Sequence, residues 1–123
     1  MSEARLALGR WGEDAAAAHL KQAGLKIVTR NVRTPVGEID LLARQGKTWV
    51  FVEVKTRRSR RCGTPAEAVT PRKQQQIIRT ARWYLAENRL EESEVRFDVV
   101  SVALADGEVE IEHLPAAFEV ECV

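Results

Sequence analysis

The chain has 123 residues, of which 45% are hydrophobic and 30% are charged. This length suits one domain with one continuous core and is too short for two cores of ordinary size. The composition is that of a globular chain rather than a disordered one. We therefore expect a single domain over residues 1–123.

The amino-acid sequence shows no pattern typical of a targeting signal. No window holds about 18 consecutive apolar residues, so we expect no transmembrane helix. The N-terminus has no apolar signal-peptide core, which favours a cytoplasmic protein. Cys62 and Cys122 have no C-x-x-C spacing, which argues against a zinc site or a disulfide framework and favours free thiols. The net charge of +1 hides a basic middle and an acidic C-terminal part.

The first expected element is a helix over residues 3–23, which are alanine-rich and stop at Gly24. A strand follows over residues 25–32 and is broken at Thr34-Pro35. The later expected elements are strands at 36–44 and 47–55, a helix from Pro71 to about residue 87 with Thr70 as its N-cap, and strands at 95–104 and 108–114. The expected inward face of the second helix comprises Ile77, Ile78, Ala81, Tyr84 and Leu85. The order α-β-β-β-α-β-β predicts an α/β fold in which helices flank a mixed sheet.

The two central strands are predicted to form a hairpin around the loop Gln45-Gly46, with Arg44 opposite Lys47. Because side chains alternate along strands, the two faces of this hairpin differ. One face is apolar and contains Ile39, Leu41, Ala43, Val50, Val52 and Val54. The other is apolar near the turn and carries charges at its open end, namely Glu38, Asp40, Glu53 and Lys55. In this register Glu38 lies opposite Glu53, and Asp40 is its diagonal neighbour.

Carboxylates crowded on adjacent strands repel one another and raise each other's pKa values. A divalent cation that takes oxygen ligands from Asp40 and Glu53 would remove this conflict, and Mg²⁺ is the natural candidate, with Mn²⁺ as a substitute. Lys55 points to the same side as Glu53, where its ammonium could hold a phosphate and orient or deprotonate an attacking water. The alternative is a solvated lattice of ion pairs without chemistry.

The inward stripe of the first helix runs Leu6, Gly9, Ala16 and Leu20, and Glu13 fills the gap in its spacing between Gly9 and Ala16. The alternatives for Glu13 are a functional carboxylate and a buried glutamate bonded to an arginine or to the backbone. A second group of candidates is basic, and it could grip nucleic-acid phosphates or simply be solvated. It comprises Arg57, Arg58, Arg60, Arg61, Arg72 and Lys73. Asp98 shares its strand with Arg96, which favours a structural ion pair.

Two motifs give the chain a family resemblance. Gly37-Glu38-Ile39-Asp40, followed after a hairpin by Phe51-Val52-Glu53-Val54-Lys55, resembles the PD-(D/E)-x-K nuclease superfamily with its restriction-endonuclease-like fold. With the segments at residues 9–13, 52–57 and 97–100, the chain resembles the YraN-like uncharacterised bacterial family over roughly residues 5–103. The arrangement is also similar to archaeal Holliday junction resolvases, which carry a glutamate on the first helix.

The resemblance implies roles for individual residues. Asp40 and Glu53 would bind the metal, with the backbone carbonyl of Val54 as a further ligand, and Lys55 would be the catalytic lysine. Glu13 would be the first-helix carboxylate that reaches the metal site. The resolvases act as symmetric dimers, so a homodimer formed through an exposed edge strand is an expectation by analogy.

The function that these patterns favour is a metal-dependent endonuclease that hydrolyses phosphodiester bonds of DNA, including branched or structured DNA. Two alternatives remain open. One is a nucleic-acid-binding module without turnover, and the other is a protein-interaction domain in DNA processing whose acidic C-terminal part meets a partner.

Overall fold

The structure, a computed structural model, describes residues 3–57 and 69–119. Its elements are α1 (Glu3–Gln22), β1 (Lys26–Thr34), β2 (Gly37–Gln45), β3 (Thr48–Arg57), α2 (Pro71–Glu87), β4 (Val95–Ala105) and β5 (Glu108–Phe118). The expected order α-β-β-β-α-β-β is confirmed. Within the described ranges, neither helix combines the length and the apolar composition that a membrane span requires.

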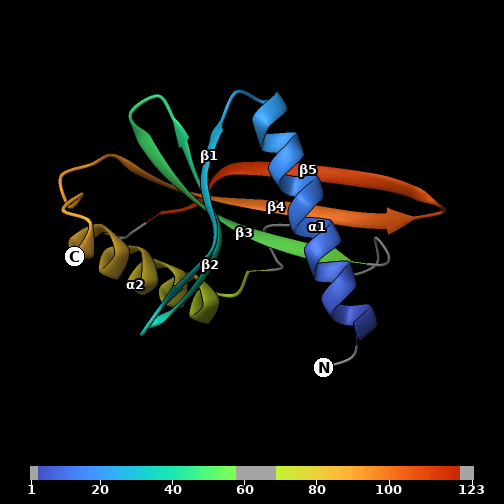
Figure 1. Ribbon diagram of the computed structural model, residues 1–123, viewed down its shortest axis with the longest axis horizontal. Coiled ribbons are helices and arrows are strands. Elements are labelled where there is room, and N and C mark those ends of the chain that lie inside the picture. The colour runs from blue at the N-terminus through green and yellow to red at the C-terminus, as the bar shows by residue number, and fades with distance from the viewer. Residues whose placement is uncertain (1–2, 58–68, 120–123) are drawn as a thin grey trace.

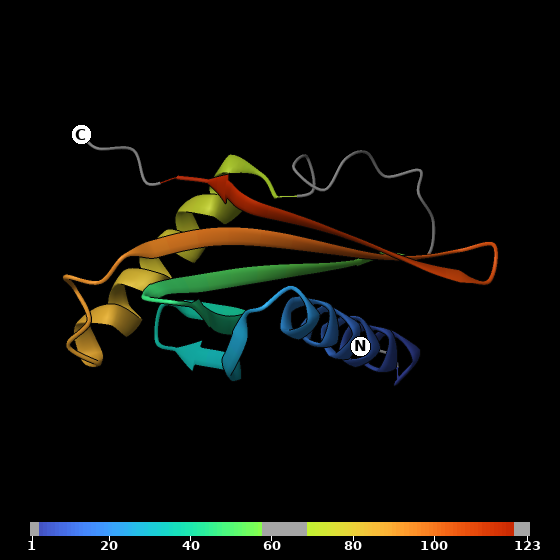
Figure 2. The same cartoon turned by 90° about the horizontal axis from the view of Figure 1, so that it is seen from above.

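The five strands form one sheet in the order β1-β2-β3-β4-β5 (Figure 1). Strands β3 and β4 are parallel, and the other neighbours are antiparallel. The sheet is therefore mixed, as expected, and α2 makes the crossover that a parallel pair needs. Strands β4 and β5 form a long hairpin that extends past α1 (Figure 2).

The two helices cover opposite faces of the sheet, because the alternation of strand side chains gives it two apolar surfaces. On the first face, Ala16, Ala17 and Leu20 of α1 join a core with Leu41, Ala43, Val50, Val52, Val100 and Val102. On the second face, Ile77, Ile78, Ala81 and Leu85 of α2 join a core with Ile39, Leu42, Phe51, Phe97 and Val99. The inward face expected for α2 is confirmed, with Tyr84 packed at its margin.

The β2–β3 hairpin differs from the prediction by two residues in register. Gln45 pairs with Thr48, so the loop is Gly46-Lys47 rather than Gln45-Gly46. Gly46 has φ +59°, which suits the type II′ turn, where glycine takes the first loop position. The predicted pairing of Arg44 with Lys47 is wrong because the glycine must occupy that first position. An even shift preserves the two faces but changes which residues meet across the strands.

The shift brings Asp40, in place of Glu38, alongside Glu53. Regular pairing of β2 with β3 ends at Leu41 and Val52. Beyond this last pair, the Asp40 side chain accepts a hydrogen bond from the Val54 backbone N–H, with 2.8 Å between Oδ2 and N. Ile39 then lies in the core beneath α2. The prediction that Ile39 shares the face of Leu41 is wrong. Regular pairing of β2 with β3 has ended at Asp40, so the alternation of side chains between the two faces is interrupted there.

The edge strand β5 continues to Phe118, four residues past the predicted end, across an irregularity opposite Asp98. Asp98 is fully buried and accepts two hydrogen bonds from Arg96, at 2.8 and 2.9 Å. Its carboxylate also takes the Ala116 backbone N–H at 3.0 Å and contacts His113 Nε2 at 2.7 Å. The predicted structural ion pair between Arg96 and Asp98 is confirmed. The contacts of Asp98 with His113 and Ala116 join β5 to β4.

The first helix approaches the sheet closely at Gly12. A Cβ atom built at this glycine would overlap the side chain of Thr56 on β3. Thr56 is β-branched and stiff, so it cannot easily turn away. The absence of a side chain at position 12 thus sets the distance between α1 and the sheet, and Glu13 is the next residue.

Gly12→Ala is expected to destabilise the protein, although alanine is the better helix former by about 1 kcal/mol. The overlap with Thr56 costs about 1–3 kcal/mol when a packed contact is overfilled. Gly9→Ala is the matched control, because a Cβ at Gly9 meets nothing within 4 Å, and it should stabilise by up to about 1 kcal/mol. Urea unfolding measures both free energies. Equal stabilisation by the two substitutions would contradict the close packing of α1 at Gly12.

Candidate active site

The centre of the candidate site is the carboxylate pair Asp40 and Glu53, on the neighbouring strands β2 and β3. Glu53 is 9% exposed, and its carboxyl group shares a hydrogen bond with that of Asp40. The Val54 backbone N–H donates a hydrogen bond to Asp40 Oδ2, which fixes the orientation of this carboxylate. The two side chains therefore meet where the strands separate, at the open end of the hairpin.

Burial raises the pKa of Glu53 to about 8, and the hydrogen bond and negative charge of Asp40 contribute to the rise. The positive charges of Lys73 and Lys55 act in the opposite direction. Near neutral pH the metal-free pair therefore holds one proton. One proton between two carboxylates is the arrangement expected where two negative charges cannot both be tolerated.

Two lysines stand beside this pair, from different elements. Lys55 follows Glu53 by two positions on β3, so the two side chains lie on one side of the strand. Lys73 lies in the first turn of α2, whose N-cap Thr70 accepts the Lys73 backbone N–H at 3.2 Å. Its ammonium nitrogen is 3.6 Å from Glu53 Oε2. The nearness of Lys73 to Glu53 depends on the crossover after β3, so no local spacing predicts it.

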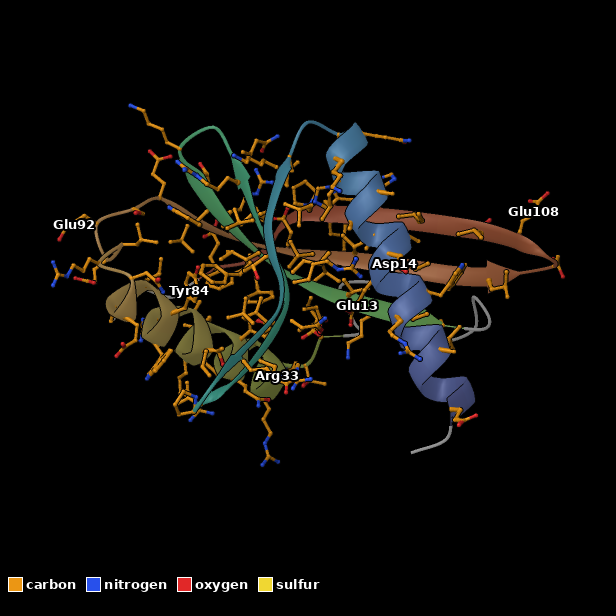
Figure 3. All side chains as sticks on the ribbon, viewed as in Figure 1. Glu13, Asp14, Arg33, Tyr84, Glu92 and Glu108 are labelled. Atoms are coloured by element: carbon orange, nitrogen blue, oxygen red, sulfur yellow. The ribbon has the colours of Figure 1, made fainter. Side chains whose placement is uncertain are left out.

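Glu13 reaches the site from α1, which Figure 3 shows beside β2 and β3. Burial raises its pKa, and the charge of Asp40 raises it further, which places the two carboxylates within electrostatic reach. A hydrogen bond from Asn31 and the charge of Arg30 act in the opposite direction. Glu13 is therefore partly buried, hydrogen-bonded to Asn31 and within electrostatic reach of both Arg30 and Asp40, and its role as a metal ligand stays a prediction. No sequence pattern predicts Asn31 as its partner.

The structure also describes the surroundings of three other predicted residues, Glu38, Arg57 and Arg72. Glu38 was expected opposite Glu53, and this is wrong: its side chain is 68% exposed and lies 3.7 Å from Arg33. Arg57 ends β3 and is half-buried, and Arg72 is exposed in the first turn of α2. The other three arginines of the basic group, Arg58, Arg60 and Arg61, lie outside the described residues.

The donors present at the site fit a hard divalent cation. Among residues 3–57 and 69–119, no group of three or more histidine, cysteine, aspartate or glutamate side chains is arranged to hold a metal. Asp40 and Glu53 form a pair of carboxylates, and Mg²⁺ is commonly held by one or two carboxylates with water and substrate phosphate. The shared proton marks a position where a cation would relieve the repulsion between the two groups. Glu13 and the Val54 carbonyl remain predicted additional ligands.

Comparison with known proteins gives one clear match. The model of the uncharacterised protein family UPF0102 matches residues 12–102. A UPF0102 protein of Syntrophotalea carbinolica is 54% identical over 121 residues, which cover 98% of both chains. Another, of Rhodococcus opacus, is 51% identical over 114 residues and covers 92% of this chain and 97% of its own. Among solved structures, Pyrococcus furiosus SfsA in complex with Ca²⁺ has a TM-score of 0.44 at 14% identity, over 90% of this chain and 65% of that one.

The raised pKa of Glu53 predicts that the metal-free protein loses stability as the pH rises. Between the ordinary glutamate value of 4.5 and about 8, the folded state holds a proton that the unfolded state has released. The free energy of unfolding should therefore fall through this window, by up to about 1.4 kcal/mol per pH unit. Glu53→Gln removes the titrating group and should flatten the slope.

Urea unfolding in EDTA at several pH values measures this dependence. Glu38→Gln is the control, because it neutralises an exposed carboxylate in the same strand region, and it should keep the wild-type slope. A wild-type stability that rises between pH 5 and pH 8 in EDTA, or a slope unchanged by Glu53→Gln, would contradict the placement of the proton.

Proposed function

The chain belongs to the uncharacterised protein family UPF0102, the YraN-like family expected from its sequence, and we propose that it is a metal-dependent endonuclease that hydrolyses phosphodiester bonds of DNA. The observation that carries this proposal is the Asp40–Glu53 pair with two lysines beside it. Carboxylate oxygens suit Mg²⁺ or Mn²⁺, and ammonium groups suit the phosphate on which such a cation acts.

In this mechanism Asp40 and Glu53 hold the cation, with Glu13 and the Val54 carbonyl as further candidates. When bound, the cation supplies Lewis-acid stabilisation of negative charge on the phosphate and favours ionisation of an attacking water. Asp40 keeps one orientation because it also accepts the Val54 N–H. A ligand fixed in this way needs no rearrangement when the substrate arrives.

The lysines have separate tasks. The Lys55 ammonium, beside Glu53 on β3, holds the scissile phosphate and orients the water for in-line attack. The Lys73 ammonium lies 3.6 Å from Glu53 Oε2 and compensates part of the negative charge that the carboxylate pair retains. Lys73 lies in the first turn of α2, where its ammonium and the helix dipole would both favour a substrate phosphate.

Substrate binding away from the cleaved bond is assigned to basic side chains, and such contacts are independent of sequence and sensitive to salt. Arg72 is exposed next to Lys73 in the first turn of α2. We therefore assign part of this binding to the start of α2. The acceptance of branched or structured DNA and the formation of a homodimer follow only from the resemblance to junction resolvases, and they stay predictions.

Cleavage assays with labelled duplex, single-stranded, flap and four-way-junction DNA test the proposal in Mg²⁺ or Mn²⁺. We expect metal-dependent cleavage that EDTA abolishes. Asp40→Asn should reduce it by at least about a hundredfold, the scale seen when one charge-stabilising group is removed. This variant retains an oxygen that can accept the Val54 N–H, so the fold should survive. Glu38→Gln serves as the control and should cleave like the wild type.

The outcomes separate the candidate functions. Persistent cleavage in purified Asp40→Asn would refute the assigned site. Salt-sensitive binding without cleavage of any substrate would favour the binding module. Neither binding nor cleavage would favour a protein-interaction domain.

A further inference from the structure

Asn31 has an unusual backbone conformation for a residue within a strand. Its φ is +53°, in the left-handed region, although it lies inside β1. Only a few per cent of non-glycine residues adopt positive φ, and asparagine is among those that tolerate it. Of the three other non-glycine residues with positive φ in the described part of the chain, Arg89 and Asp106 lie in turns, where such a conformation is ordinary. The third, Ala116, lies at the irregularity of β5 opposite Asp98, to which its backbone N–H donates a hydrogen bond. Asn31 has no turn to explain it.

The left-handed backbone changes which side chains of β1 reach the first helix. In a regular strand, consecutive side chains point to opposite faces. Here Arg30 pairs with Asp14 at 2.6 Å, and the Asn31 side chain donates a hydrogen bond to Glu13. Two consecutive residues of β1 thus contact two consecutive residues of α1. The reversal at Asn31 permits this double contact.

The position of Asn31 in the sheet connects this contact to the carboxylate pair. On either side of it, Arg30 pairs with Leu41 and Val32 pairs with Ile39. The residue between Leu41 and Ile39 is Asp40, so Asn31 and Asp40 lie alongside one another on β1 and β2. Glu13 lies within electrostatic reach of the same Asp40. The irregularity in β1 therefore coincides with the place where β2 separates from β3.

We propose that Asn31 is a positioning residue whose left-handed backbone and side-chain amide hold the Glu13 carboxylate beside Asp40. Unusual backbone conformations persist where the surrounding structure fixes them, and they cluster at functional sites. This role rests on the proposed function in one respect, because it makes Glu13 a part of the metal site. Its structural component, the contact between Asn31 and Glu13, is independent of catalysis.

The first experiment measures the contact in the metal-free protein. Asn31→Gly keeps the backbone conformation, because glycine adopts positive φ freely, and removes only the amide. A cycle with Glu13→Ala and the double variant cancels backbone effects, which are common to both backgrounds. In EDTA at pH 7.5 we expect a coupling of about three- to tenfold in the unfolding equilibrium constant, the contribution of one hydrogen bond. Equal effects of Asn31→Gly in both backgrounds would overturn the proposal.

The second experiment measures Mn²⁺ binding by calorimetry and the kinetics of cleavage. Asn31→Gly should weaken Mn²⁺ by about tenfold, as loss of a residue that orients a ligand does. It should lower kcat with little change in KM, because the substrate contacts remain. In the Glu13→Ala background the same substitution should have less than about a twofold effect.

Two controls keep the interpretation unambiguous. Arg89→Gly makes the same kind of substitution at a left-handed residue in the turn after α2, and it should leave Mn²⁺ affinity unchanged. Asn31→Asp keeps the shape of the side chain but replaces the donor with a carboxylate, so it should weaken Mn²⁺ unless the added charge itself binds the ion. Tighter binding in that variant would mean that residue 31 contacts the ion directly, which would overturn a purely positioning role.

Failure of the proposed function is distinguishable from failure of this inference. A wild-type protein that binds no Mn²⁺ and cleaves no DNA would refute the nuclease, while the metal-free cycle would still decide the contact. A wild-type nuclease whose Asn31→Gly variant binds Mn²⁺ and cleaves normally would refute the role of Asn31 alone.

Discussion

The site depends on one hydrogen bond, from the Val54 N–H to the Asp40 carboxylate, at 2.8 Å. A side chain here takes a backbone donor where regular pairing between β2 and β3 has ended. The bond satisfies a group that would otherwise lack a partner in the strand, and it fixes one carboxylate beside another. The point where the strands diverge is therefore also the point where negative charge is concentrated.

That concentration of charge has an electrostatic cost, and the surrounding elements offset it in different ways. One proton held by the pair removes one charge in the free protein. Lys73, brought by the crossover helix, places an ammonium 3.6 Å from the same carboxyl group. Gly12 lets α1 approach the sheet closely enough to bring a further carboxylate, Glu13, within electrostatic reach of Asp40, which adds to this cost. Acids kept close together in this way, against their electrostatic repulsion, are typical of a functional site.

Local patterns were sufficient to predict the elements and most of the core. Alternation in β2 and β3 identified two faces, and the inward residues Ile77, Ile78 and Ala81 of α2 are buried as expected. The hairpin register was wrong because a glycine in a two-residue loop can take either position. Only the turn geometry, with Gly46 at φ +59°, decides between the two. The register differed by an even number of residues, so the assignment of side chains to the two faces stayed correct apart from Ile39, while the residue alongside Glu53 changed from Glu38 to Asp40.

Contacts between distant segments were not predictable from spacing. The Lys73–Glu53 pair requires α2 to return across the sheet face, and the approach of Glu13 requires the close packing of Gly12 on Thr56. The resemblance to a nuclease superfamily implied a role for Glu13 but offered none for Asn31. The left-handed conformation of Asn31 is a property of the folded strand. Because asparagine tolerates this conformation in many loops and turns, its presence in the sequence does not predict such a role.

The most direct test of the account is a crystal structure of the protein soaked in Mn²⁺, with anomalous diffraction to locate the ion. The account predicts a single strong peak between the carboxylates of Asp40 and Glu53, within about 2.0–2.3 Å of an oxygen of each. The two groups would then no longer share a proton. Crystals in which Asp40 and Glu53 remain hydrogen-bonded to each other at millimolar Mn²⁺, with no peak between them, would contradict the claim that this pair is a metal site.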